Sequence, residues 1–404
     1  MPTPAPIDPD ALRRCVAPDR DVRTLPAAAY VSDAVHRWEL EHFFDASWVC
    51  VGRSSALATP GDQAAVRAGT QAVLLVRGTD GELRGFFNTC RHRGHELLPC
   101  GGGPVNQSVV RCPYHRWTYA LDGAFKGGPG LAGQAGFDRR DREHDLVAAR
   151  VREWRGWAFV NVSGDAPPFD RHVGRLDELV AAHELERVVP AASHSYDLRA
   201  NWKIAVENYH ECYHCSEIHP ELCRVTTPGS GDHFAPSGLV VGGSMLLDDG
   251  MATMSFDGAS RAAPFRRLSG RALREVHYVQ VWPNLLLSVH PDYVMTHVLT
   301  PLAAGRTEVA CEWSFAPEAL ERPGFDPSFA VDFWDLTNRQ DWAACESVQR
   351  GAAGRGYRQA PLSRHERNVA DVIAMVATGY LDGGPPTPVD AQPRERSRSV
   401  ARTT

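Results

Sequence analysis

The sequence predicts an α+β fold in which an all-β module is followed by a larger domain that combines helices with an antiparallel sheet. Between about residues 50 and 162, short apolar runs alternate with turns rich in Gly, Asp and Asn, which is typical of antiparallel strands. After about residue 166, segments with helical periodicity lie on either side of a stretch rich in β-branched residues. The 404 residues correspond to two or three domains, and a hydrophobic content of 43% is enough to bury a core.

The overall charge and the apolar pattern argue against several classes of protein. A net charge of −6 gives no electrostatic reason to bind nucleic acid or anionic membranes. No apolar run approaches the roughly 18 residues of a membrane helix, and the N-terminal sequence MPTPAPIDPDALRR lacks the apolar stretch of a secretory signal. We therefore expect a cytoplasmic protein. In that reducing compartment the ten cysteines are expected to be metal ligands or buried side chains rather than a disulfide framework.

Residues 1–45 are expected to form a helical segment, because four large apolar side chains lie near helical spacing. These side chains are Trp38, Leu40, Phe43 and Phe44. A β domain is expected over residues 46–165, beginning with a strand at 48–52 and continuing through the apolar runs AVLLVRG, FFNTC and WAFVNV. Within it, the five glycines of residues 127–137 predict a loop.

The domain expected over residues 166–382 contains four segments with helical periodicity and one group of strands. The helical segments are residues 176–188, 201–215, 329–348 and 365–381. Residues 277–315 contain three or four runs rich in β-branched residues, with turns between them. The Pro- and Arg-rich residues 383–404 have no apolar pattern, so we expect this tail to be disordered.

Two short loops of the β domain each pair a thiol with an imidazole. They are Cys90-Arg-His92 and Cys112-Pro-Tyr-His115, with nineteen residues between His92 and Cys112. A structural zinc site is one alternative, but zinc fingers pair Cys with Cys and His with His. A mixed pair on each loop favours a Rieske [2Fe–2S] centre, in which two histidines replace two cysteines on one iron. The flanking sequences CRHRGHEL and CPYHRWTYALDG look like the two cluster-binding loops of Rieske proteins.

A second group of metal-binding residue types lies in ENYHECYHCSEIHPEL, where Glu211, His214 and His219 have the spacing E-x2-H-x4-H. Pro220 disfavours helical geometry at His219, so unwinding there would let this side chain approach His214. Two histidines and a carboxylate with open positions are the ligands of non-haem iron(II) oxygenases. The carboxylate is either Glu211 or Asp341 of the later helical segment. Cys212 and Cys215 are interpreted as buried structural cysteines rather than a redox dithiol.

Together these motifs resemble the catalytic α subunits of Rieske non-haem iron oxygenases over residues 40–380. The resemblance implies a Rieske domain, a helix-grip catalytic domain and an N-terminal segment that packs against the latter. It implies that Cys90, His92, Cys112 and His115 bind the cluster and that His214, His219 and Asp341 bind iron. It also implies a head-to-tail homotrimer, in which Glu211 bridges an iron-ligand histidine to a cluster histidine of the neighbouring subunit. One departure is Arg116, which stands where Gly is common in the family.

Within that family, NWKIAVENYHECYHC and PNLLLSVHPDYVMTH are most similar to the quaternary-ammonium oxygenases. The resemblance implies the terminal oxygenase component of a monooxygenase that hydroxylates an N-methyl group of a compound such as glycine betaine. Electrons would come from an NAD(P)H-dependent reductase, directly or through a ferredoxin. A trimethylammonium group would require aromatic faces, for which the candidates are Tyr209, Tyr213, Phe234, Phe256, Trp282 and Tyr293.

Three other functions remain as alternatives. The same scaffold would serve a ring-hydroxylating dioxygenase or an O-demethylase of an aromatic acid. An electron carrier would need only the cluster-binding module, which is about a quarter of the chain, and would leave the second motif without a purpose. A binding protein stabilised by zinc would be colourless, whereas a Rieske cluster makes a protein red-brown.

Overall fold

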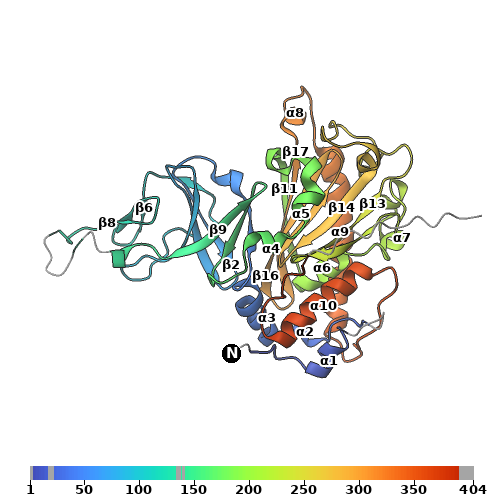
Figure 1. The fold of residues 1–404 in the computed structure, drawn as a ribbon, viewed down its shortest axis with the longest axis horizontal. Helices are drawn as coiled ribbons and strands as arrows, with labels where there is room; N and C mark the ends of the chain where they lie inside the picture. Colours follow the sequence, from blue (N-terminus) through green and yellow to red (C-terminus); the bar gives the residue numbers. More distant parts are fainter. Residues whose placement is uncertain (1–2, 17–21, 133–137, 139–141, 391–404) are drawn as a thin grey trace, which may run out of the picture.

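The computed structural model describes residues 3–16, 22–132, 138 and 142–390. The chain forms two domains that lie side by side, a smaller one built from strands β1 to β10 and a larger one that contains a second sheet and the long helices (Figure 1). This arrangement confirms the predicted α+β class. No helix in these ranges is both long and apolar enough to cross a membrane.

The smaller domain contains a seven-stranded antiparallel sheet and a three-stranded sheet. The order of the first is β1-β10-β9-β4-β3-β2-β5, and the order of the second is β6-β7-β8. The bounds are β1 Val49–Arg53, β2 Asp62–Ala68, β3 Gln71–Arg77, β4 Leu83–Phe87, β5 Val105–Asn106, β6 Val110–Arg111, β7 Thr118–Tyr119, β8 Phe125–Gly127, β9 Ala148–Trp154 and β10 Trp157–Asn161. Of the glycine-rich segment predicted as a loop, Gly127 ends β8 and residues 133–137 lie outside the described ranges.

The larger domain is built on a seven-stranded antiparallel sheet with the order β11-β17-β16-β15-β14-β13-β12. Residues 277–315 supply four of its strands, which is the upper end of the predicted number, and the other three were not predicted. The bounds are β11 Val189–Leu198, β12 His233–Ser237, β13 Val240–Leu246, β14 Glu275–Val281, β15 Leu285–Val289, β16 Tyr293–Ala303 and β17 Arg306–Phe315.

Helices cover both faces of this sheet, as the alternating side chains of β15 illustrate. Leu285 and Leu287 pack with the short helices α4 (Phe169–Val173) and α5 (Leu176–Val180). Leu286 points to the opposite face and belongs to the apolar cluster that includes residues of three other helices. These are α6 (Trp202–Tyr209), α9 (Ser328–Ala352) and α10 (Arg367–Asp382). The two longest, α9 and α10, lie close to the segments predicted from periodicity.

Two predicted helices are shorter than expected. Residues 176–188 form α5 followed by two turns of 3-10 helix, because Glu184 adopts a left-handed backbone conformation with φ of 47°. The helix predicted over residues 201–215 ends at Tyr209, and a second helix, α7 (Cys215–Ile218), starts after a turn. The carboxylate of Glu211 accepts hydrogen bonds from the backbone N–H groups of Tyr213 and His214 and thereby favours the turn over a continuous helix.

The N-terminal segment packs against the larger domain. It contains α1 (Pro9–Arg13), α2 (Ala28–Val31), α3 (Asp33–Glu39) and a π-helical turn at Leu40–Phe44. The ring of Phe43 lies 5.1 Å from that of Trp282 and 5.1 Å from that of Tyr380. One further helix, α8 (Pro317–Leu320), follows the last strand of the larger sheet.

The prediction of a disordered tail over residues 383–404 is wrong for residues 383–390, which the structure describes. Gly238 and Val389 exchange two backbone hydrogen bonds of 2.8 and 2.9 Å, which fix this part of the chain beside the turn between β12 and β13. Residues 391–404, the remainder of that tail, lie outside the described ranges. The two domains are joined through Asn284, whose amide donates to the Cys50 carbonyl and accepts from the Cys50 N–H, both at 2.9 Å.

Candidate functional site

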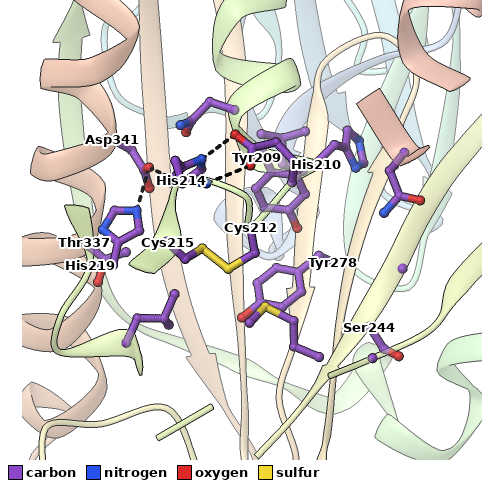
Figure 2. Close-up of a pocket in the computed structure, with 18 of the residues that line it drawn as sticks. Tyr209, His210, Cys212, His214, Cys215, His219, Ser244, Tyr278, Thr337 and Asp341 are labelled. Atoms are coloured by element: carbon purple, nitrogen blue, oxygen red, sulfur yellow. Dashed lines mark hydrogen bonds and ion pairs between the residues drawn. A yellow bond between two sulfur atoms is a disulfide. The ribbon is translucent and has the colours of Figure 1, made fainter. Parts of the chain in front are cut away.

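His214, His219 and Asp341 meet at one point in the larger domain (Figure 2). Their nearest ligand atoms all lie within 4.8 Å of one another, and no other group of three such side chains in the described part of the chain is as compact. Asp341 Oδ1 lies 2.9 Å from His219 Nε2 and 3.3 Å from His214 Nε2. Asp341, rather than Glu211, is therefore the carboxylate between the two imidazoles.

The local fold explains why two histidines five residues apart come together. His214 is the residue immediately before α7 and His219 is the residue immediately after it, so the two side chains lie at the ends of a four-residue helix. His219 leaves helical geometry with φ of −123° and ψ of 64°, as Pro220 predicts. Asp341 comes from the middle of α9, so the site ties together segments more than 120 residues apart.

The outer nitrogen of each histidine has its own acceptor. Nδ1 of His214 donates to the carboxylate of Glu211, and Nδ1 of His219 donates to Oε1 of Gln340 at 2.7 Å. Both Nδ1 atoms are thus occupied, so each ring turns its Nε2 toward Asp341, and this is the atom that would bind a metal after losing its proton. Two imidazole nitrogens and one carboxylate are the donor set that fits non-haem iron(II).

The carboxylates dominate the electrostatics of this group. Burial alone would lower the pKa of His214, but hydrogen bonds with Asp341 and Glu211 outweigh it and raise that pKa to about 9. Burial also opposes ionisation of Asp341, yet the hydrogen bonds from His214 and His219 lower its pKa below the usual value. The group therefore holds a negative carboxylate where a cation would bind.

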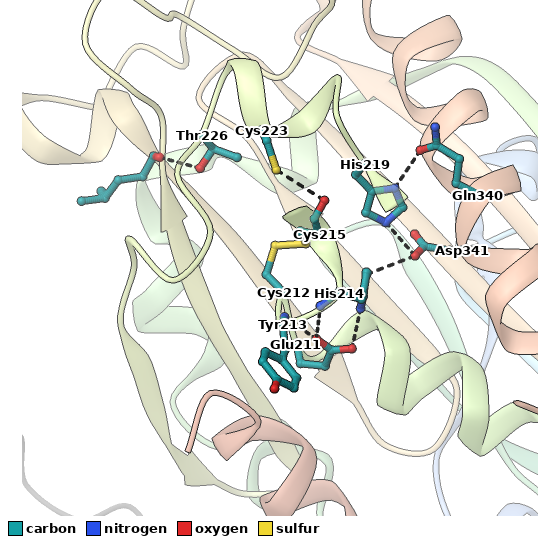
Figure 3. Close-up of a disulfide and its surroundings, with 11 residues drawn as sticks. Glu211, Cys212, Tyr213, His214, Cys215, His219, Cys223, Thr226, Gln340 and Asp341 are labelled. Carbon is teal, nitrogen blue, oxygen red and sulfur yellow. Dashed lines mark hydrogen bonds and ion pairs between the residues drawn. A yellow bond between two sulfur atoms is a disulfide. The ribbon is translucent and has the colours of Figure 1, made fainter. Parts of the chain in front are cut away.

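A disulfide joins Cys212 to Cys215 within the turn that leads to His214 (Figure 3). The two residues were predicted to be buried structural cysteines; the structure corrects this by joining them in a disulfide, with Cys215 buried and Cys212 partly buried. The turn brings the two Cα atoms to 4.9 Å, which is within the range that a disulfide bridges. The remaining eight cysteines of the chain are free thiols.

A cavity of about 320 Å³ opens beside His214, His219 and Asp341. Three aromatic rings in series form part of its wall: Tyr209 and Tyr278 have centroids 5.8 Å apart, and Tyr278 and Trp334 have centroids 6.3 Å apart. Arg364 and Arg367 also line this cavity, and neither forms an ion pair with a carboxylate among the described residues. Figure 2 shows Tyr209 and Tyr278 in the same pocket as His214, His219 and Asp341.

Of the six aromatic residues suggested by the sequence, only Tyr209 lines the cavity. Tyr213 is 60% exposed and stacks on His365. The other four are absent from the wall, namely Phe234, Phe256, Trp282 and Tyr293. Tyr278 and Trp334 were missed because their inward orientation depends on the register of β14 and on the face that α9 presents. Strand and helix periodicity alone did not distinguish these positions from ordinary core.

The two Cys/His loops of the smaller domain also come together. The thiols of Cys90 and Cys112 are buried, with exposures of 2% and 1%. The rings of His92 and His115 lie 4.7 Å apart near the surface. Tyr119 supports the first loop, because its hydroxyl lies 3.3 Å from Cys90 Sγ and accepts from the Arg91 N–H at 3.0 Å.

The arrangement of these four side chains argues for a binuclear cluster rather than zinc. One zinc ion with ligands at about 2.0–2.3 Å would draw all four donor atoms within about 4 Å of each other. Their ligand atoms do not form a group that compact. Buried thiols with imidazoles nearer the surface fit a Rieske [2Fe–2S] centre instead. At Arg116, where the family commonly has Gly, φ is 58°, which is the left-handed region that Gly adopts most easily.

A Cys/His cluster domain joined to a catalytic domain with two histidines and a carboxylate defines a Rieske oxygenase. Comparison with protein families agrees: residues 47–138 match the Rieske [2Fe-2S] domain, and residues 185–380 match the ring hydroxylating alpha subunit (catalytic domain). The chain belongs to the Rieske non-haem iron oxygenases. Like the family, it has a Rieske cluster domain and a catalytic domain of the mononuclear-iron type, and it receives electrons from a reductase.

Among characterised relatives, the chain is similar to the glycine betaine monooxygenase oxygenase subunit of Chromohalobacter salexigens. The two are 30% identical over 387 residues, which cover 87% of this chain and 84% of the relative. The carnitine monooxygenase oxygenase subunit of Escherichia coli is 31% identical over 350 residues, covering 85% and 88%. The structure of the quaternary ammonium Rieske monooxygenase CntA with L-carnitine matches with a TM-score of 0.76 and 26% identity, covering 93% of this chain and 99% of that one. The chain is thus a relative of quaternary ammonium monooxygenases.

Proposed function

We propose that this chain is the terminal oxygenase that hydroxylates an N-methyl group of a quaternary ammonium compound such as glycine betaine. The observation that carries the proposal is the series of aromatic rings beside the two-histidine, one-carboxylate group, formed by Tyr209, Tyr278 and Trp334. The faces of such rings attract a quaternary ammonium cation, which has no hydrogen to donate. Arg364 and Arg367 on the same cavity would pair with the carboxylate of a betaine.

The metal-binding roles follow from the donor atoms described above. Cys90, His92, Cys112 and His115 would hold the cluster, and His214, His219 and Asp341 would hold the iron. When bound, the cluster supplies electrons one at a time and the iron supplies O2 activation. The chain itself would orient the substrate methyl group, exclude bulk water from the cavity and fix the ligand geometry.

The overall reaction balances as an oxidative N-demethylation. Two electrons from NAD(P)H, two protons and one O2 convert one N-methyl group into N–CH2OH and release one water. The carbinolamine then breaks its C–N bond: the electron pair stays on nitrogen, the hydroxyl proton is released and formaldehyde leaves. The product is the tertiary amine.

Glu211 would connect the two metal centres of neighbouring subunits. Its Oε1 accepts from His214 Nδ1 only, and its side chain is 14% exposed, so this oxygen retains a lone pair for a second partner. In a head-to-tail trimer that partner would be a cluster histidine of the adjacent subunit. We propose this homotrimer as the working assembly, with an NAD(P)H-dependent reductase and optionally a ferredoxin as electron donors in the cytoplasm.

A second candidate is the oxygenation of an aromatic acid. The 2-halobenzoate 1,2-dioxygenase large subunit of Burkholderia cepacia is 28% identical over 362 residues, covering 80% of this chain and 77% of that relative. Aromatic walls together with Arg364 and Arg367 would also accommodate a benzoate ring and its carboxylate. The glycine betaine and carnitine monooxygenase subunits match at higher identity and coverage than this dioxygenase, which supports the first candidate.

A single-turnover experiment distinguishes them. Chemically reduced, iron-loaded protein is mixed with O2 and a pool of betaines and aromatic acids, and the products are identified by mass spectrometry. We expect one betaine to lose a methyl group with formation of an equal amount of formaldehyde. Addition of one or two oxygens to an aromatic acid, with every betaine intact, would replace the proposal by the second candidate. Asp341→Asn is the control, because it should retain the cluster and lose turnover.

A further inference from the structure

Gln340 and Asp341 are consecutive residues of α9 that contact opposite sides of one imidazole (Figure 3). Gln340 Oε1 lies 2.7 Å from His219 Nδ1, and Asp341 Oδ1 lies 2.9 Å from His219 Nε2. His219 itself is 1% exposed. One turn of a helix therefore holds the ring between an amide and the carboxylate of the metal-binding group.

The direction of the Gln340 amide is determined by a third residue. Its Nε2 lies 3.4 Å from the carboxylate of Glu221, which only accepts hydrogen bonds when ionised. The amide NH2 therefore faces Glu221 and the amide oxygen faces His219. An acceptor at Nδ1 requires a proton on that nitrogen, which leaves the Nε2 lone pair directed at the metal position.

The two histidines differ in the charge of their outer acceptors. Glu211 presents a carboxylate to His214, whereas Gln340 presents a neutral amide to His219. A carboxylate at both positions would place a further negative charge beside Asp341 and Glu221. The neutral amide orients His219 without adding that charge.

We propose that Gln340 is a positioning residue that holds His219 in the tautomer and orientation required to bind iron, with Glu221 orienting Gln340 in turn. The inference rests on the proposed iron site formed by His214, His219 and Asp341. It assigns Gln340 a role through His219 and no direct contact with substrate. Loss of an outer hydrogen bond of this kind typically weakens metal affinity by about tenfold to a hundredfold.

The test compares Gln340→Met with Gln349→Met. Both remove a glutamine from α9 and keep a similar side-chain volume, but Gln349 bonds to the Asn201 N–H and the Tyr30 carbonyl and has no contact with the metal-binding group. The dissociation constant for iron(II) is measured anaerobically by chelator competition, and the visible spectrum of the cobalt(II)-substituted protein reports ligand geometry. Far-ultraviolet circular dichroism and a cooperative thermal unfolding transition show that the larger domain of each variant is folded.

We expect Gln340→Met to weaken iron binding by about tenfold or more and to change the cobalt spectrum, while Gln349→Met leaves both unchanged. Equal iron affinity in Gln340→Met and wild type would overturn the inference. If wild-type protein fails to bind iron at this position, the proposed iron site fails instead, so the two failures are distinguishable. No substrate is required for either measurement.

A charge exchange provides a second test in case Gln340→Met does not fold. The double variant Glu221→Gln/Gln340→Glu retains an acceptor for His219 Nδ1 and a donor–acceptor pair between positions 221 and 340. We expect it to bind iron within about threefold of wild type, whereas Gln340→Glu alone places two carboxylates together and binds more weakly. A double variant that binds no better than Gln340→Glu would contradict the proposed orientation by Glu221.

Discussion

Lys203 and Glu39 form an ion pair from which solvent is excluded: Nζ lies 2.5 Å from Oε1, and the side chains are 0% and 1% exposed. Trp202 Nε1 donates to the second oxygen of Glu39 at 2.9 Å, and the Tyr380 hydroxyl also donates to this carboxylate. The group links α3, α6 and α10. Since α6 leads directly into the turn that carries Glu211 and His214, the ion pair anchors the segment that supplies the metal-binding group.

Replacing Lys203 by Met is expected to destabilise the protein by about 3–5 kcal/mol, because Glu39 would remain as a buried and unpaired charge. Chemical denaturation followed by tryptophan fluorescence measures the change, since Trp202 contacts the pair. The double variant Glu39→Gln/Lys203→Met removes both charges and should be less destabilised than Lys203→Met alone. Equal losses in the two variants would show that the buried charge is not the cause.

Acid should destabilise the larger domain through His172, which is 1% exposed and donates from Nε2 to the Trp282 carbonyl at 2.8 Å. Burial lowers the pKa of His172 from 6.5 to about 4. The folded state thus binds fewer protons than the unfolded state, so the stability contributed by the neutral ring is present above pH 6.5 and is lost as the pH falls toward 4.

The variant His172→Gln isolates this contribution, because an amide still donates to the Trp282 carbonyl but does not titrate. Between pH 7.5 and 5.5, the wild-type free energy of unfolding should fall by about 1.3 kcal/mol more than that of the variant. Denaturant titrations at the two pH values provide the comparison. Parallel pH profiles for the two proteins would exclude His172 as the acid-sensitive group.

Long elements with a regular apolar pattern were predictable from the sequence, and elements decided by single side chains were not. Helices α9 and α10 span several turns, so their periodicity was sufficient. The ends of α5 and α6 depend on the left-handed backbone of Glu184 and on the hydrogen bonds that Glu211 makes to the following turn. Neither effect changes the apolar pattern. Strand β11 was missed because it lies at the edge of the sheet and most of its side chains are at least partly exposed.

The same distinction applies to the candidate site. Sequence spacing was enough to predict His214 and His219 as metal ligands, because both lie in one short motif. Asp341 is 122 residues beyond His219, and only the resemblance to a family selected it over Glu211. Gln340 carried no signal of its own, since its role depends on the rotation of α9 about its axis.

If Cys212 and Cys215 form a disulfide, fewer cysteines should react with an alkylating reagent before reduction than after it. The chain has ten cysteines, of which Cys212 and Cys215 are bonded to each other, so eight are expected to react after denaturation without reductant. Cluster removal with acid and a chelator precedes alkylation, and mass spectrometry counts the labels. Ten labels should appear after prior reduction. The double variant Cys212→Ser/Cys215→Ser should give eight under both conditions, whereas ten labels on unreduced wild type would show that the two residues are thiols.

Glu211 is expected to control electron delivery rather than the presence of either metal centre. In Glu211→Gln the amide oxygen still accepts from His214 Nδ1, but the amide NH2 cannot accept from the Tyr213 and His214 N–H groups, so the reoxidation rate is compared per bound iron and cluster. The negative charge that stabilises a proton between two imidazoles is lost, and reoxidation of the reduced cluster by O2 in the presence of substrate should slow by about tenfold to a hundredfold. Stopped-flow absorption of the cluster measures this rate.

Glu217→Gln, at an exposed position of α7, is the matched control and should reoxidise at the wild-type rate. If Glu211→Gln reoxidises as fast as that control, the electron path between subunits does not pass through Glu211.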